Sequence, residues 1–145
     1  MGHPTVLVVD DDDDLRETMC AVLDDAGYAT IAMPGGESAI EYLGRADPPD
    51  LIILDLMMPG IDGWRVREEL RKLPRVADVP IVVATASRAL ARHPVDAAVI
   101  LWKPFSAREL LDAVARFSPT VSPADPALES PEVSRRALAP RCSPR

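Results

Sequence analysis

The sequence contains three short runs of uninterrupted apolar residues, at 6–9, 51–54 and 81–84. Runs of this length, rich in β-branched residues, are typical of strands that are buried on both faces of a sheet. Between the runs, apolar residues recur every three or four positions, as they do along one face of a helix. A chain that alternates in this way is restricted to repeated strand–helix–strand units. The sequence therefore predicts an α/β fold with a parallel sheet.

The complete pattern predicts five strands. They are expected at 6–9, at 28–32 as a weaker strand, and at 51–54, 81–84 and 98–102. Helices are expected at 13–26, at 36–43, from 62–63 to 73, and from Ser106 to Phe117. Such units within residues 1–117 fit the flavodoxin-like doubly wound sheet, whose strand order is 2-1-3-4-5. Ser106 followed by Glu109 predicts a capping box at the start of the last helix.

Polar residues follow the carboxyl ends of the predicted strands. Asp10 and Asp11 follow the first strand, Asp55 the third, Thr85 the fourth and Lys103 the fifth. Because these ends meet at one edge of a parallel sheet, the three carboxylates are expected to lie in one crevice. Carboxylates this close repel one another unless a cation lies between them. Oxygen ligands favour Mg²⁺, and Mn²⁺ is a second candidate.

This set of side chains suits phosphoryl transfer. Asp55 would attack phosphorus in line, and the cation and Lys103 would neutralise charge on the phosphoryl oxygens. The Thr85 hydroxyl would donate a hydrogen bond to one of these oxygens. Each residue alone is a weak signal. The pattern becomes specific because each one stands at the end of the appropriate strand.

The chain resembles the receiver domains of two-component response regulators over residues 4–117. The matching segments are Val8-Val9-Asp10-Asp11, Leu54-Asp55-Leu56-Met57-Met58-Pro59-Gly60-Ile61-Asp62-Gly63, Ala84-Thr85-Ala86 and Lys103-Pro104-Phe105. The resemblance implies that Asp55 is the phosphoacceptor. It also implies that a sensor histidine kinase or a phosphotransfer protein supplies the phosphoryl group.

The resemblance also implies a set of ligands. Asp11, Asp55 and the backbone carbonyl of Met57 would bind Mg²⁺, and Asp10 would help to hold the ion through water. The phosphoryl group would be contacted by Thr85, Ala86 and Lys103. In this family the peptide bond before the proline that follows the lysine, here Pro104, is often cis.

The sequence departs from the family in the region that normally reads out phosphorylation. Most receivers have an aromatic residue three positions before the lysine, where this chain has Ile100. Trp102 is the only large aromatic residue nearby, and the segment from Thr85 to Lys103 is shorter than usual and contains Pro94. We therefore expect a short or irregular fourth helix and an altered output face. The candidate switch residues are Thr85, Ile100, Trp102 and Pro104.

Three consecutive acids that follow the metal-site residues have a simpler role. Asp13 or Asp14 is expected to cap the first helix, and acids in a first helical turn interact favourably with the helix dipole. Met57 and Ser87 flank the site, and we hypothesise that they tune how long the phosphoryl group persists. Trp64 is expected at the edge of the core.

Composition excludes several functions. The net charge of −7 argues against general nucleic-acid binding. The sequence has no apolar stretch long enough to span a membrane and no signal peptide, and these features predict a cytoplasmic location. Residues 118–145 contain six prolines and few apolar residues, and they are expected to be disordered. The chain is thus expected to act through an unknown downstream protein and not through an output domain.

Two other functions fit parts of the pattern. A haloacid-dehalogenase-type phosphatase would use Asp10 as nucleophile and Asp12 as general acid. That class leaves the Asp55 loop unexplained. A receiver-fold interaction module that is not phosphorylated would explain Ile100 and the shortened fourth-helix region, but not the intact site. On the receiver interpretation the chain is not an enzyme, beyond catalysing its own phosphorylation and dephosphorylation.

Overall fold

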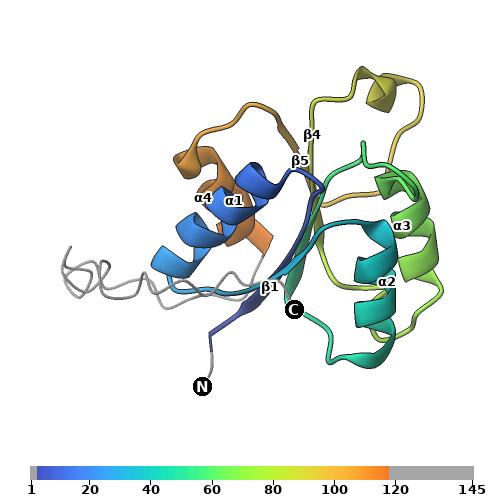
Figure 1. Ribbon diagram of the computed structural model, residues 1–145, viewed down its shortest axis with the longest axis horizontal. Helices are drawn as coiled ribbons and strands as arrows, with labels where there is room; N and C mark the ends of the chain where they lie inside the picture. The colour runs from blue at the N-terminus through green and yellow to red at the C-terminus, as the bar shows by residue number, and fades with distance from the viewer. Residues whose placement is uncertain (1–2, 118–145) are drawn as a thin grey trace.

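The computed structural model describes residues 3–117, which form a five-stranded parallel sheet between two layers of helices (Figure 1). The strands are β1 (Thr5–Val9), β2 (Ala29–Met33), β3 (Leu51–Leu54), β4 (Ile81–Thr85) and β5 (Val99–Trp102). Their order in the sheet is β2-β1-β3-β4-β5, which confirms the predicted flavodoxin-like topology. Helices α1 (Asp13–Asp25) and α4 (Ala107–Phe117) cover one face, and α2 (Gly36–Arg45) and α3 (Gly63–Arg71) cover the other.

Alternate side chains of the strands form two separate cores. In β1, Val6 and Val8 pack in the cluster beneath α1 and α4, whereas Leu7 and Val9 pack in the cluster beneath α2 and α3. All four residues are buried, as is every residue of β3. These two runs, residues 6–9 and 51–54, are uninterrupted and apolar because both of their faces must be buried.

The first helix is capped by Asp12, so the expectation that Asp13 or Asp14 caps it is wrong. Asp12 has extended backbone angles, and its carboxylate accepts a hydrogen bond from the Leu15 N–H at 3.1 Å. Asp13 lies inside the first turn and pairs with Arg16 at 2.6 Å. The cap falls one residue earlier because the chain turns into the helix immediately after Asp10 and Asp11.

The capping box of the last helix is confirmed. The Glu109 N–H donates to Ser106 Oγ at 3.0 Å, and Glu109 Oε1 accepts from the Ser106 N–H at 2.8 Å. These two bonds satisfy backbone donors that the helix itself leaves unpaired. They fix where α4 begins, immediately beyond the loop that carries Lys103.

The connection between β4 and β5 contains only a single turn of 3-10 helix, η1 (Arg88–Ala91). This confirms that the fourth helix is short or irregular. The connection is attached to α3, because Arg67 and Arg71 both pair with Asp96 at 3.1 Å. Trp64 Nε1 also donates to the His93 carbonyl at 2.6 Å. The Trp64 ring packs at the edge of the core beneath α2 and α3, as predicted.

Two sequence predictions concern regions at the limits of the described structure. Residues 118–145, which are predicted to be disordered, lie outside the described residues. The predicted domain boundary after residue 117 therefore stays a prediction. None of the described helices has the length and apolar character that crossing a membrane requires.

Gly63 allows α3 to lie directly against the end of β3. A Cβ atom at this position would lie 2.7 Å from the Leu56 Cα and closer still to the Asp55 carbonyl oxygen. We predict that Gly63→Ala lowers the free energy of unfolding by about 1–3 kcal/mol, because the clash is with backbone.

Gly44→Ala is the matched control, since a Cβ atom at Gly44 in α2 meets nothing within 4 Å. There alanine should stabilise the fold by about 0.5–1 kcal/mol. Urea denaturation of both variants measures the difference. Equal effects would contradict the close approach of α3 to β3.

Candidate functional site

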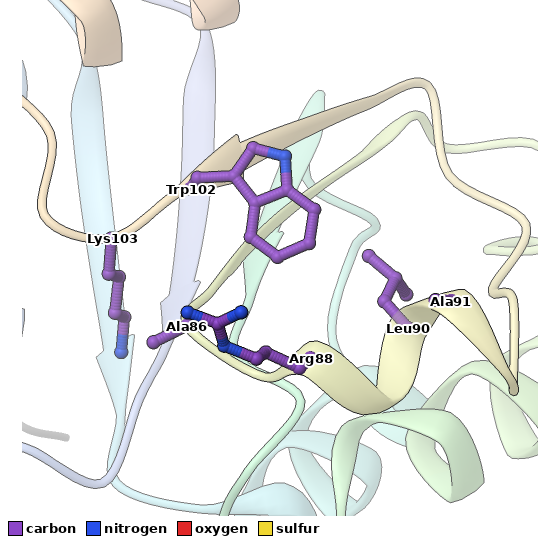
Figure 2. A pocket seen from close by; sticks show the side chains of 6 residues that line it. All are labelled: Ala86, Arg88, Leu90, Ala91, Trp102 and Lys103. Atoms are coloured by element: carbon purple, nitrogen blue, oxygen red, sulfur yellow. The ribbon is translucent and has the colours of Figure 1, made fainter.

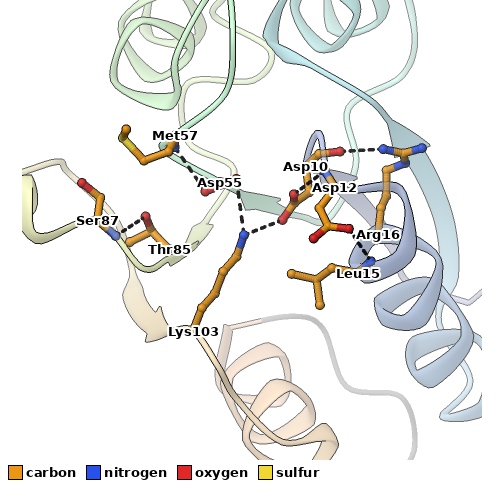
Figure 3. Close-up of polar contacts among 9 residues, drawn as sticks. All are labelled: Asp10, Asp12, Leu15, Arg16, Asp55, Met57, Thr85, Ser87 and Lys103. Atoms are coloured by element: carbon orange, nitrogen blue, oxygen red, sulfur yellow. Dashed lines mark hydrogen bonds and ion pairs between the residues drawn. The ribbon is translucent and has the colours of Figure 1, made fainter.

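The predicted site residues meet at the carboxyl edge of the sheet (Figure 3). Asp10 follows β1, Asp55 follows β3, Thr85 ends β4 and Lys103 follows β5. In this sheet β3 lies between β1 and β4, so the loops that follow these strands are neighbours. Because the strands are parallel, their carboxyl ends lie at the same edge of the sheet, and residues that are far apart in the sequence come together there.

Three carboxylates form a compact cluster. Asp10, Asp11 and Asp55 each offer an oxygen atom, and these atoms all lie within 4.8 Å of one another. Asp10 and Asp55 are buried, whereas Asp11 is exposed. The cluster therefore has a buried base and one acid open to solvent.

The Lys103 ammonium joins the two buried acids. Its Nζ lies 3.0 Å from Asp10 Oδ2 and 3.3 Å from Asp55 Oδ2 (Figure 3). Burial alone would lower the pKa of Lys103. The hydrogen bonds and charges of Asp10 and Asp55 outweigh burial, so the pKa of Lys103 is raised and the side chain is held in its charged form.

Backbone and side-chain donors orient the two buried acids. Asp10 Oδ1 accepts from the Asp12 N–H at 2.9 Å, and Asp55 Oδ1 accepts from the Met57 N–H at 3.2 Å. Each carboxylate thus has one oxygen fixed by the following loop and the other directed at Lys103. Arg16 adds a contact to the Asp10 backbone carbonyl at 2.7 Å.

Sequence reasoning missed Arg16. Its guanidinium is buried and connects the Asp10 carbonyl to the Asp13 carboxylate, which fixes the start of α1 against the site. One signal was present, because Arg16 is one of only two basic residues among the first 55.

The pKa of the Asp55 carboxyl is raised above its ordinary value. Burial contributes most, and the negative charge of Asp10 adds to it. Lys103 and the Met57 N–H act in the opposite direction without cancelling these effects. Ionised Asp55 is therefore held in a place that disfavours its charge, as is common at functional sites.

Thr85 lies beneath the site and connects it to the next loop. Its side chain is fully buried, and its hydroxyl oxygen accepts from the Ser87 N–H at 3.0 Å. The hydroxyl hydrogen is left to donate elsewhere. Ala86 is exposed and lines a pocket of about 590 Å³ together with the acids, Lys103, Met57 and Ser87.

The candidate switch residues differ in their surroundings. Ile100 is half-buried and packs on the core beneath α2 and α3. Trp102 is 51% exposed on β5. The peptide bond between Lys103 and Pro104 is cis, as the family resemblance implied. The switching roles of these residues stay predictions.

The donor set fits a magnesium ion. Carboxylate and carbonyl oxygens are the ligands that Mg²⁺ takes, usually with several waters retained. The clustered oxygens of Asp10, Asp11 and Asp55 meet that requirement, and Asp11 leaves one side of the cluster open to water.

Comparison with known proteins gives the family. The sequence matches the response regulator receiver domain over residues 6–115, and the chain belongs to this family. It is 36% identical over 115 residues to the transcriptional regulatory protein BaeR of Escherichia coli, covering 77% of this chain and 46% of BaeR. It is 36% identical to the response regulator MprA of Mycolicibacterium vanbaalenii, covering 86% of this chain and 54% of MprA. The chain thus spans about half the length of these curated relatives.

Solved structures agree with this assignment. The chemotaxis protein CheY4 of Vibrio cholerae superposes with a TM-score of 0.74 at 28% identity, covering 80% of this chain and 99% of CheY4. The receiver domain of the sensor histidine kinase PA1611 from Pseudomonas aeruginosa has a TM-score of 0.73 at 27% identity, covering 80% of this chain and 98% of that one. The PA1611 structure has a magnesium ion coordinated in its active-site cleft. The family match favours the receiver interpretation over a phosphatase, and Asp12 is already engaged as a helix cap.

The raised pKa of Asp55 predicts how stability depends on pH. A carboxyl with a raised pKa binds its proton more tightly in the folded state, so its ionisation costs stability as pH rises through the folded-state pKa. We expect Asp55→Asn, measured without divalent cations, to raise the free energy of unfolding at pH 7 by on the order of 1–2 kcal/mol. This gain should shrink as pH falls below the raised pKa, where wild-type Asp55 is itself neutral.

Thermal unfolding of both proteins between pH 4 and 8 measures this effect. Asp47→Asn is the control, because Asp47 is exposed and its charge lies outside the Asp10–Asp11–Asp55 cluster. A gain for Asp55→Asn that did not vary with pH would contradict the prediction.

Asp11 provides the test of metal binding. We predict that Asp11→Asn weakens Mg²⁺ binding at least about tenfold, because it removes one charged ligand oxygen from the cluster. Asp14→Asn removes an exposed charge from the same acidic run without touching the cluster, and should change the affinity little. Isothermal titration calorimetry gives both values. Equal losses in the two variants would show that only the general negative charge attracts the ion.

Proposed function

We propose that this chain is a phosphoacceptor switch of a two-component or phosphorelay system. Asp55 takes a phosphoryl group from a histidine kinase or a phosphotransfer protein, and the phosphorylated chain acts through a partner protein. The observation that carries the proposal is the Asp10–Asp11–Asp55 cluster with Lys103 bound to both buried acids. The chain is then a phosphoryl acceptor that catalyses at most its own phosphorylation and dephosphorylation.

The reaction is an in-line displacement at phosphorus. An Asp55 Oδ attacks the phosphorus atom of a phosphohistidine, the P–N bond breaks, and its electron pair stays on the imidazole nitrogen of the donor. Asp55 Oδ2 is the suitable nucleophile, since Oδ1 is held by the Met57 N–H. Lys103 then exchanges its contact with that oxygen for one with a phosphoryl oxygen.

The remaining residues stabilise the transferred charge. The Thr85 hydroxyl is free to donate to a phosphoryl oxygen while it accepts from Ser87. The exposed Ala86 lines the same pocket, and its backbone N–H would be a further donor to the phosphoryl group. Asp11, Asp55 and the Met57 carbonyl would hold Mg²⁺, with Asp10 acting through water. When bound, the ion offsets the negative charge of the acids and of the phosphoryl oxygens.

The charge of the chain bears on the kind of partner that it binds. Relatives such as BaeR are named transcriptional regulatory proteins. The acidic balance of this chain argues against direct binding to nucleic acid, so we propose a protein target. We also propose a cytoplasmic location, because none of the described helices could cross a membrane.

Intact-mass measurement after incubation with acetyl phosphate tests the proposal. We expect a single phosphoryl adduct that requires Mg²⁺ and is absent in Asp55→Asn. The adduct should be retained in Asp47→Asn, which removes an exposed acid remote from the cluster.

Two other results would overturn the proposal. Mg²⁺ binding without any adduct would indicate an interaction module that is not phosphorylated. Steady release of phosphate that survives Asp55→Asn but is lost in Asp10→Asn would indicate a phosphatase.

A further inference from the structure

Arg88 lies between two neighbouring pockets. The first is the pocket of about 590 Å³ that Asp10, Asp11, Asp55 and Lys103 line, and Arg88 forms part of its wall. The second, of about 560 Å³, lies between η1 and the end of β5, and Arg88 lines it together with Trp102, Leu90 and others. Figure 2 shows the Arg88 side chain reaching back from η1 toward Ala86, and the Trp102 ring forms another part of the lining of the same pocket.

The Arg88 guanidinium is not committed to another role. Within residues 3–117 the structure gives it no hydrogen bond and no ion pair, whereas Lys103 is held by both buried acids. Arg88 is exposed, so its long side chain can turn to either pocket. It is also the second cation on the wall of the acidic pocket, beside Lys103.

Phosphorylation would favour the position of the Arg88 guanidinium in the acidic pocket over its position in the pocket beside Trp102. This step rests on the proposed function, in which Asp55 carries the phosphoryl group. A phosphoryl group has close to two negative charges and several acceptor oxygens. The planar guanidinium can bind two such oxygens at once. Before phosphorylation the carboxylates offer no comparable pair of oxygens, because Lys103 already contacts both buried acids.

Withdrawal of Arg88 would alter the second pocket. Trp102 is 51% exposed at its wall, and the remaining lining includes the apolar side chains of Leu90 and Ala91. Once the charged group has left, the indole gains by packing on these apolar atoms, because burying aromatic surface is favourable.

We propose that Arg88 binds the phosphoryl group on Asp55 and, by leaving the pocket beside Trp102, transmits the phosphorylated state to that surface. Ile100 packs in the core beneath α2 and α3, so it does not line this pocket. The shortened connection between β4 and β5 instead brings an arginine directly from η1 to the phosphorylation site.

Beryllofluoride, which occupies the position of the phosphoryl group on an aspartate, tests this proposal on the full chain with Mg²⁺. Fluorine-19 NMR measures its binding, and tryptophan fluorescence reports the second pocket. In the wild type we expect Trp102 emission to shift to shorter wavelength on binding, and Trp102→Phe identifies the signal because Trp64 remains. Arg88→Ala should weaken beryllofluoride binding about tenfold or more and should lack the shift even at saturation.

Arg92→Ala is the matched control, because Arg92 is also exposed at the end of η1 but lines neither pocket. It should bind beryllofluoride and shift its emission as the wild type does. Wild-type affinity together with a normal shift in Arg88→Ala would overturn this inference alone. Failure of the wild type to bind beryllofluoride, or to form the Asp55 adduct with acetyl phosphate, would overturn the proposed function and the inference with it.

Discussion

The contact of Lys103 with Asp10 and Asp55 is the interaction on which the site depends. It joins the ends of β1, β3 and β5, which are far apart in the sequence. Without the ammonium, two buried carboxylates would face each other with no compensating charge, which is strongly unfavourable. The sheet order brings these groups together, and the lysine makes their proximity tolerable.

The charge of Lys103 compensates only part of the negative charge of the three carboxylates, and this imbalance determines what the site can bind. One ammonium serves three clustered carboxylates, so the cluster retains negative charge that favours a divalent cation. The raised pKa of Asp55 is a second sign of the same imbalance. The fold gives up some stability here to hold the Asp55 carboxylate beside a second buried acid, as functional sites often do.

The strands and the strand-end residues were predictable because both follow from burial. A strand covered on both faces must be apolar throughout, so a polar residue directly after it marks the sheet edge. The cap of α1 was not predictable, since Asp12, Asp13 and Asp14 are chemically identical and only backbone geometry selects Asp12. The contacts of Arg16, and the position of Arg88 on the walls of two pockets, depend on the conformations of long side chains. Periodicity does not encode that information.

β5 is an edge strand of the sheet, and it ends at the residues that form the site. An exposed strand edge invites pairing with another chain, which leads toward aggregation. Here the strand is short and is followed at once by Lys103 and Pro104, a charged residue and one without a backbone N–H. Pro104, which follows the lysine of the site and has no backbone N–H, therefore also helps to keep the open side of the sheet from recruiting a foreign strand.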